Sequence, residues 1–501
     1  MNQRKAGTIL TYISMLLNSA IMLVYVPMLL HFFTKAEYGL YQLVASMIAY
    51  LSVMDFGLSS TITRYYAGAM ATEDADKKKR IISSGLFIYA AATALILIVG
   101  IILLFFINPV YRNTLSAQEL LTAKKIFCIL LFNIALLIPG NLFIGLINAH
   151  ERFVFLRGVN IAKTVLQPLA VFFILSWRAD IVNIALTQTA FVIAITAINI
   201  FYCFSRLKIK LPAVKPQIPF TKEMAGFSFF VFLRTVSNQV YWQLGQLVLG
   251  AVVGVSAVAG YSIAIQISTF YVFLSCAMNG MFLPKLSLIC AATNDMTEVN
   301  GIFCKIGRLQ LFIALTVFFG FVLFGRQFIQ IWIGPGFGAT YWVAVIIMAA
   351  YLICISQSVG ISILEAKNKH AFFAYVSVSA IILNILLCIP LARAYGAIGC
   401  AAASAICLLL TYGLLMNWHY KRVGLDLKVF FKNFLQIAAP AFIAFALYLP
   451  LLKYVLGFTT NIFYLALQIL LFMILNTGLA WAAGFNDYEK DLIKTPLKLI
   501  R

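Results

Sequence analysis

The sequence predicts an all-α membrane protein that crosses the bilayer many times, and three observations support this. Only 11% of the 501 residues are charged and 63% are hydrophobic. The charges gather in short islands between apolar runs of about 20 residues or more, the length a helix needs to cross a hydrocarbon core of roughly 30 Å. The longest interruptions, near 71–80, 205–222 and 287–305, are too short for a soluble core. Any function must therefore be performed in or beside the membrane.

A hydropathy window of about 19 residues predicts about fourteen membrane-spanning helices along the chain. The first seven are expected at 8–30, 40–63, 81–106, 125–148, 154–176, 181–204 and 224–251. The second seven are expected at 256–283, 306–325, 340–364, 371–391, 397–418, 433–452 and 460–484.

Basic residues dominate the charged islands and give a net charge of +21. In a soluble protein this charge would suggest nucleic-acid binding. Here most of the lysine and arginine residues fall in alternate loops, above all 77–80 and 206–215. This is the bias that orients membrane proteins, with the basic loops in the cytoplasm. We therefore expect both termini on the cytoplasmic side and no nucleic-acid partner.

A weak internal repeat divides the predicted spans into two groups of six. The basic connector 146–153 lies over the connector 364–370 when the second half of the chain is laid on the first. Both halves start on the same side and hold an even number of spans, which is typical of parallel repeats; the alternative is chance similarity between apolar runs. The predicted domains are a lobe at 1–210, a second lobe at 211–430, and two further helices with a cytoplasmic tail at 431–501.

Short motifs in both halves resemble those of bacterial Wzx-type flippases, which move polysaccharide units and belong to the multidrug/oligosaccharidyl-lipid/polysaccharide exporter superfamily. In the first half they are Pro27 with Tyr38-Gly39-Leu40-Tyr41, Asp55-Phe56-Gly57-Leu58 and Arg64-Tyr65-Tyr66. In the second half they are Gly260-Tyr261-Ser262, Ile331-Trp332-Ile333-Gly334 and Gly396-Ala397-Ile398-Gly399.

The resemblance implies a non-enzymatic transporter in the bacterial cytoplasmic (inner) membrane, with two six-helix lobes enclosing a cavity. Its substrate would be an undecaprenyl-diphosphate-linked oligosaccharide, moved by alternating access for O-antigen, capsule or exopolysaccharide assembly. Membrane lipid, the polysaccharide polymerase and the chain-length machinery are the implied partners. In similar lipid-II flippases the last two helices are associated with a groove for the lipid tail.

Two cations at the middle of predicted spans are the main candidates for binding substrate. Arg234 and Lys163 each lie about ten residues into a span, near mid-depth at about 1.5 Å per residue. Each would cost about 2.5–3.5 kcal/mol if it faced lipid. We interpret them as a basic site for the diphosphate, with Arg234 suited to bidentate contact and Lys163 a point charge. The alternative is a structural ion pair or a side chain that extends to the interface.

Arg64 and Asp55 lie in the second predicted span. Arg64 is either another phosphate contact or an anchor at the cytoplasmic interface. In a straight helix the nine residues between them place the two side chains on nearly opposite faces, although Gly57 could bend that helix. Asp55 either balances Arg234 or Arg64, which we favour, or carries a coupling proton.

Other residues in the spans suggest weaker hypotheses. Tyr241, Trp242, Tyr261 and Tyr271 could stack on sugar rings, or could simply pack in the protein. Pro139 and Pro168 interrupt the fourth and fifth spans and are either hinges or static kinks. The nine cysteines show no C-x-x-C spacing and no histidine partners, so we expect neither a metal site nor a cofactor.

Two other functions remain as alternatives to the flippase. A cation-coupled multidrug exporter of the same fold should present carboxylates to its cationic substrates, whereas Asp55 is the one convincing acidic residue at membrane depth. A membrane glycan polymerase should have a substantial extramembrane loop with clustered Asp, His or Arg. The short loops of this chain argue against it.

Overall fold

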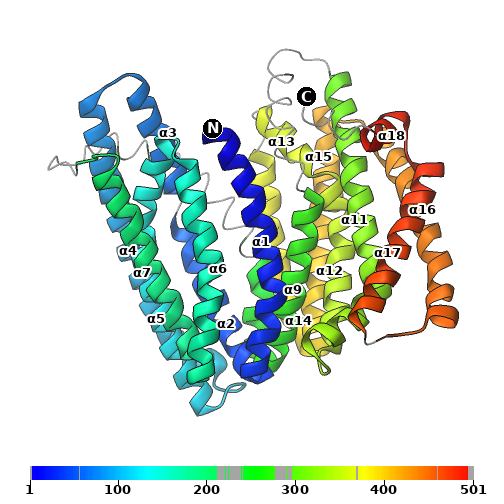
Figure 1. Cartoon of the computed structure of the whole chain (residues 1–501), viewed down its shortest axis with the longest axis horizontal. Coiled ribbons are helices and arrows are strands. Elements are labelled where there is room, and N and C mark those ends of the chain that lie inside the picture. The colour runs from blue at the N-terminus through cyan, green and yellow to red at the C-terminus, as the bar shows by residue number, and fades with distance from the viewer. Residues whose placement is uncertain are drawn as a thin grey trace. The chain divides into compact units, whose positions relative to one another are not determined.

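The computed structural model describes residues 3–55, 57–210, 221, 224, 239, 241–276, 289, 296–367, 371–459 and 461–494. Within these ranges every regular element is a helix (Figure 1). Eleven of the described helical segments are long and apolar enough to cross a bilayer. The prediction of an all-α polytopic membrane protein is therefore confirmed.

The helices agree with the predicted spans after three adjustments. The predicted pair 371–391 and 397–418 falls within one continuous apolar stretch, Tyr375–Val423. The first helix contributes the shorter apolar segment Leu16–Phe32. The predicted seventh span, 224–251, lies largely outside the described residues.

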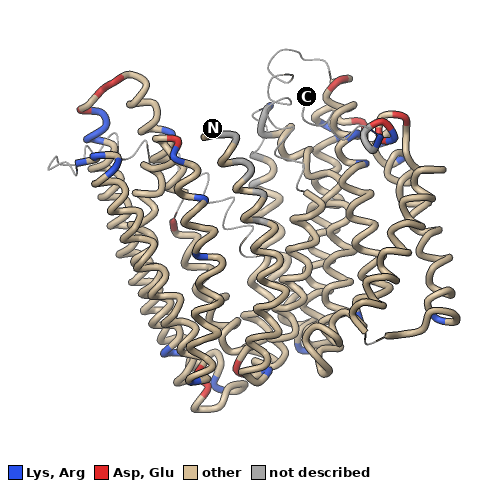
Figure 2. Tube along the Cα trace, in the orientation of Figure 1, with Lys and Arg blue, Asp and Glu red and all other residues tan. Residues whose placement is uncertain are grey.

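Charged residues are concentrated near the ends of the helices, and only a few lie part-way along them (Figure 2). This distribution is expected when the middle of each helix is solvated by lipid and its ends by water. The few charges along the helices therefore require a physical explanation.

The chain forms two compact units, Met1–Ala259 and Gly260–Arg501. The division into three parts expected from the sequence remains a prediction, and its first boundary adjoins residues 211–220, which lie outside the described part of the chain. The helices of the first unit are α1 (Gln3–Phe32), α2 (Lys35–Ser52), η1 (Val53–Asp55), α3 (Leu58–Ala71), α4 (Ala75–Tyr111), α5 (Ala117–Ala149), α6 (Phe153–Trp177) and α7 (Val182–Ser205).

Helix α5 is the centre of the first unit, because α2, α3, α4 and α7 all pack against it, while α1 packs along α6. Two helix starts are fixed by reciprocal side-chain caps, Thr34 with Glu37 at α2 and Ser116 with Glu119 at α5. Gly145 on α5 allows α3 to approach closely, since a Cβ there would lie 2.9 Å from the carbonyl oxygen of Ser59.

The second unit is built around α11, which contacts α12, α13, α16 and α17. Its helices are most of α9 (Val255–Cys276), α11 (Met296–Ile333), α12 (Gly338–Ser356), α13 (Ser358–Ala366), α14 (Ala371–Leu408), η2 (Leu409–Leu415), α15 (Met416–Val423), α16 (Leu427–Leu451), η3 (Leu452–Leu456), α17 (Ile462–Leu479), η4 (Ala480–Gly484) and α18 (Asp487–Lys494). Gly396, with φ 59° and ψ −134°, breaks α14 where the sequence predicts two separate spans.

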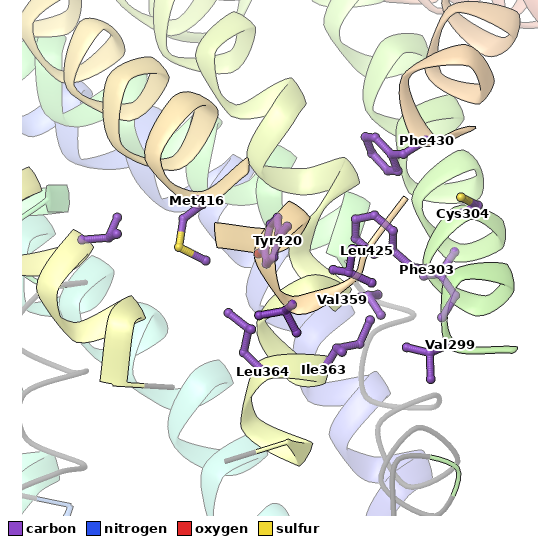
Figure 3. Packing of buried hydrophobic residues seen from close by; sticks show 13 residues of the cluster. Val299, Phe303, Cys304, Val359, Ile363, Leu364, Met416, Tyr420, Leu425 and Phe430 are labelled. Atoms are coloured by element: carbon purple, nitrogen blue, oxygen red, sulfur yellow. The ribbon is translucent and has the colours of Figure 1, made fainter. Parts of the chain in front are cut away.

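Buried side chains from five helices, α11, α13, α14, α15 and α16, form a core at one end of this unit. Phe303 of α11, Ile363 of α13, Tyr420 of α15 and Phe430 of α16 all belong to one cluster, and Figure 3 shows their side chains among the cluster's other members. The rings of Phe303 and Phe430 stack with centroids 4.8 Å apart.

The two C-terminal spans, α16 and α17, pack on α11 rather than standing alone. Phe324 of α11, Tyr448 of α16 and Phe472 of α17 make edge-to-face contacts, and the Tyr448 hydroxyl donates to the carbonyl oxygen of Gln468 at 2.8 Å. Asn476 on α17 also donates to the hydroxyl of Thr316 on α11 at 2.7 Å. These contacts make the C-terminal spans part of the second unit.

Candidate functional site

The second predicted span is a broken helix. Helix α2 ends at Ser52, the single turn η1 follows, and α3 begins after Gly57, whose φ of 62° is left-handed and favours glycine. Asp55 lies at this break and is half-buried. Its carboxylate accepts a hydrogen bond from the side-chain amide of Asn141 on α5 at 3.1 Å. At this break the Asp55 carboxylate therefore lies against α5, where it is hydrogen-bonded to the Asn141 amide.

Asp55 and Arg64 form no ion pair in the described part of the first unit. The argument from a straight helix does not apply to them, because the chain changes direction at Gly57. Arg64 is exposed on α3 and has interactions of its own. Arg234 lies outside the described residues, so its role as a phosphate contact remains a prediction.

Lys163 belongs to a stripe of polar side chains along α6. At about 100° per residue these side chains share roughly 120° of the helix circumference. We call the following set the α6 polar stripe: Arg157, Asn160, Lys163, Thr164 and Gln167.

The α6 polar stripe lies on the side of the helix opposite its exposed apolar side. Phe173 and Trp177, which are 69% and 93% exposed, lie on that apolar side. The buried residues Val171 and Leu175 lie instead on the same side as the stripe. The polar side chains therefore point away from the surface that lipid would cover.

The two cations of the stripe have no partner among the side chains that the structure describes. No ion pair or hydrogen bond is formed by Arg157 or Lys163 there, and both side chains are partly accessible. Lys163 is about ten residues, or roughly 15 Å, from the start of α6, which is near mid-depth. A cation at this depth is stable only if water or an anion solvates it. The stripe therefore has the charge and access needed to bind an anionic group.

The structure separates the four aromatic residues predicted to stack on sugars. Tyr261 and Tyr271 are each only 1% exposed, so they pack inside the protein and their faces are not available to a sugar in this conformation. For these two residues the structure supports the packing alternative. Tyr241 and Trp242 are partly exposed, with their rings edge-to-face at 5.4 Å. Sugar stacking by these four residues remains a prediction.

Pro139 and Pro168 lie inside α5 and α6, and both helices continue on either side of the proline. Breaks in the described helices occur elsewhere, for example at Gly57 and at Gly396. The role of the prolines as hinges remains a prediction.

Two features of the structure were missed in the sequence. Arg157, Asn160 and Gln167 share the side of α6 that holds Lys163, and their spacing along the helix is a signal that could have been read. The second is Arg308 on α11, which is buried and bonded to Glu489 on α18 at 2.6 Å. No local pattern relates those two residues. No cluster of three potential metal ligands occurs in the described ranges.

Comparison with known proteins agrees with this arrangement. Residues 5–288 match the family described as polysaccharide biosynthesis protein, which is more than half of the chain. The chain belongs to this family. The resemblance of its motifs to the polysaccharide-unit flippases is thereby confirmed.

Two named relatives are distant in sequence. A Haloferax volcanii protein named as the low-salt glycan biosynthesis flippase Agl15 is 21% identical over 40% of the chain, and the match spans 42% of that protein's length. A Shigella flexneri protein named as an O-antigen transporter is 20% identical over 77% of the chain and 90% of its own length.

Solved transporter structures share the fold of this family member. The lipid II flippase MurJ in an inward closed conformation has a TM-score of 0.76 at 17% identity, covering 97% of the chain and 99% of MurJ. A multidrug resistance MATE family transporter in an inward-facing conformation has a TM-score of 0.65 at 11% identity, covering 80% of the chain and 94% of that protein. At these identities the likeness shows the fold and does not decide between lipid-linked and drug substrates.

Proposed function

We propose that the protein is a flippase that moves undecaprenyl-diphosphate-linked oligosaccharide units across the cytoplasmic membrane by alternating access. The headgroup would pass through the water-accessible interior while the lipid tail stays in the bilayer. The product would serve O-antigen, capsule or exopolysaccharide assembly. The single observation that best supports this proposal is the α6 polar stripe with its two unpaired cations.

The chemistry of the stripe suits a lipid diphosphate. A guanidinium can contact two phosphate oxygens at once, and an ammonium adds a compact positive charge. A charge-assisted hydrogen bond contributes about 1.5–3 kcal/mol, which helps to offset the loss of water around the phosphates. Arg157 and Lys163 would be the first contacts, with Arg64 and Arg234 as further ones and Asp55 as a counter-charge.

A cation-coupled multidrug exporter is less consistent with these residues. Such a site should present carboxylates to its cationic substrate. The α6 polar stripe contains two cations and no acidic residue. A glycan polymerase would instead need a catalytic cluster outside the membrane. The two relatives of this chain are named as a flippase and a transporter, which also argues against a polymerase.

The proposal also covers location and partners. Both termini would be cytoplasmic in the bacterial inner membrane, since the basic islands gather on the predicted inner side. The polysaccharide polymerase and the chain-length machinery are the expected neighbours, because they use the flipped unit. Co-purification from native membranes would test this association.

Reconstitution tests the transport proposal directly. The purified chain is placed in liposomes with a fluorescent undecaprenyl-diphosphate oligosaccharide, and the label reaching the opposite leaflet is measured with a membrane-impermeant quencher. Lys163→Ala and Arg157→Ala should each slow transport about ten- to hundred-fold, because each removes one phosphate contact. Lys163→Arg should restore part of the rate.

The control is Arg178→Ala. Arg178 is exposed at the far end of α6 and lies outside the stripe, so its loss should change transport less than two-fold, about the effect of a weak exposed ion pair. Normal transport by a correctly inserted double variant lacking both Arg157 and Lys163 would contradict the proposed phosphate site. Export of a cationic dye without any transport of the glycan lipid would favour the multidrug exporter instead.

A further inference from the structure

A pocket of about 540 Å³ lies at one end of the second unit, where the chain turns from α11 into α12. The segment 334–337 connects the two helices, and the break in α14 near Gly396 contributes Ile398 to the pocket wall. The other lining residues include Arg326, Gln330, Gly338, Tyr341 and Trp342, and no lining residue is acidic.

The charged group of this pocket is held in place by aromatic rings. The guanidinium of Arg326 lies 5.0 Å from the ring centre of Tyr341 and 5.1 Å from that of Trp342. The Tyr341 ring is itself fixed, because its hydroxyl donates to the carbonyl oxygen of Val322 at 2.8 Å and it stacks on Phe321 at 5.9 Å. Contact with aromatic rings uses the positive charge of a guanidinium and forms no hydrogen bond to an acceptor, so its N–H groups can still donate to other partners.

Arg326 has no carboxylate partner within the described ranges. Its side chain is exposed, and so is that of Trp342, at 46%. The pocket therefore combines an uncompensated positive charge, planar donors and an accessible indole at the end of a membrane-spanning helix. Exposed indoles at such helix ends are typical of the depth at which lipid headgroups lie.

Three glycines leave room at the pocket wall. A Cβ added at Gly334, Gly336 or Gly338 would meet no other atom within 4 Å. The first two have φ of 85° and 97°, so their backbone conformation explains the glycine. Gly338 has no such requirement, since it is the first residue of α12 and has ordinary backbone angles. Because Gly338 lines the pocket, a side chain added there would enter unoccupied space.

We propose that this pocket binds the phosphate group of a lipid headgroup. Arg326 donates to the phosphate oxygens, and Trp342 and Tyr341 form the wall beside the headgroup. The site is separate from the α6 polar stripe and does not require the chain to be a flippase. The lipid could be an anionic phospholipid of the surrounding leaflet or a polyprenyl diphosphate, and both present the same phosphate chemistry.

Calorimetric titration of the full-length protein in neutral detergent tests this site. The probes are dihexanoyl phosphatidylglycerol, for phospholipid, and farnesyl diphosphate, for the polyprenyl lipid. All titrations are made with the Lys163→Ala variant, so that the α6 polar stripe contributes little to the signal. Arg326→Gln should weaken binding of at least one probe by about ten-fold or more, because it removes a charged, bidentate donor. The probe that binds more tightly identifies the source of the phosphate.

Two further variants separate a built site from general attraction to a basic helix end. Gly338→Leu keeps Arg326 but fills the open space, so it should also abolish most of the binding. Arg393→Gln removes an exposed arginine in α14, five residues before the pocket residue Ile398, and should change the affinity less than two-fold, like other weakly engaged surface charges. Equal losses for Arg326→Gln and Arg393→Gln, or full binding by Gly338→Leu, would overturn the proposal. Since the stripe variant is the common background, failure here leaves the transport proposal unaffected.

Discussion

The pair formed by Arg308 and Glu489 gives the sharpest prediction about stability. Both side chains are buried, 4% and 2% exposed. Arg308 donates to the two carboxylate oxygens of Glu489 at 2.6 and 2.8 Å, to the carbonyl oxygen of Gly484 at 2.7 Å, and to the side chains of Asn433 and Gln436 at 3.2 and 3.0 Å. These contacts use all the N–H donors of a guanidinium and join α11 to α16 and α18.

The burial of both side chains sets the expected loss of stability when the pair is broken. Replacing Glu489 with Ala leaves a buried, uncompensated guanidinium, and breaking a buried pair in this way costs about 3–5 kcal/mol. Glu489 also accepts from the backbone N–H of Asn486 at 2.9 Å, so the start of α18 loses a cap as well. Replacing Arg308 with Met should destabilise by a similar amount, because the carboxylate is then left buried. The double variant should be more stable than either single one, since no lone charge remains.

The assay compares the free energy of unfolding in bicelles for the wild type, both single variants and the double variant. Trypsin provides a second measurement, because release of α18 should speed cleavage after Lys490. The control is Lys305→Gln, on the same helix. Lys305 is exposed and lies 4.9 Å from the ring of Tyr488, and its loss should cost no more than about 1 kcal/mol. The reasoning is refuted if Glu489→Ala is as stable as this control, or if the two single effects simply add in the double variant.

Two smaller predictions concern a turn and a hydrogen bond, each measured as the change in melting temperature in detergent. Gly57→Ala should destabilise by about 1–2 kcal/mol, because its left-handed φ of 62° disfavours a side chain. Gly68→Ala, in the last turn of α3 where an added Cβ meets no atom within 4 Å, should be neutral or stabilising. An unchanged melting temperature for Gly57→Ala would contradict this. Tyr448→Phe should cost about 1 kcal/mol, because it removes the bond to the carbonyl oxygen of Gln468. The exposed Tyr454→Phe is its control, and equal effects of the two would rule out that explanation.

Much of the fold could be predicted from the distribution of apolar and charged residues along the chain. The spans at 154–176 and 181–204 correspond closely to α6 and α7. The separation of 371–391 from 397–418 corresponds to the break at Gly396. Such predictions succeed because lipid requires each crossing segment to be apolar and to satisfy its own backbone hydrogen bonds. The signal is therefore local in the sequence.

The candidate site was predicted less completely. The charge of Lys163 at mid-depth was evident in the sequence. Whether its side chain points toward lipid or away from it became known only from the exposure of the other residues of α6. The burial of Tyr261 and Tyr271 could not be predicted either, because an aromatic residue in a span gives the same hydropathy signal whether it lines a cavity or packs in a core. Burial depends on neighbouring helices, which a hydropathy window does not include.

The sequence by itself determined that the protein is a bundle of membrane-spanning helices, where the apolar part of most of those helices lies, and that its few intramembrane charges are mainly basic. Only the tertiary structure decided which of those charges are paired. Arg308 and Glu489 are separated by 181 residues and meet because α18 packs beside α11. Lys163, by contrast, finds no partner among the described side chains. The physical reason is that transfer into lipid is a property of each segment, whereas pairing of charges depends on how distant segments pack together.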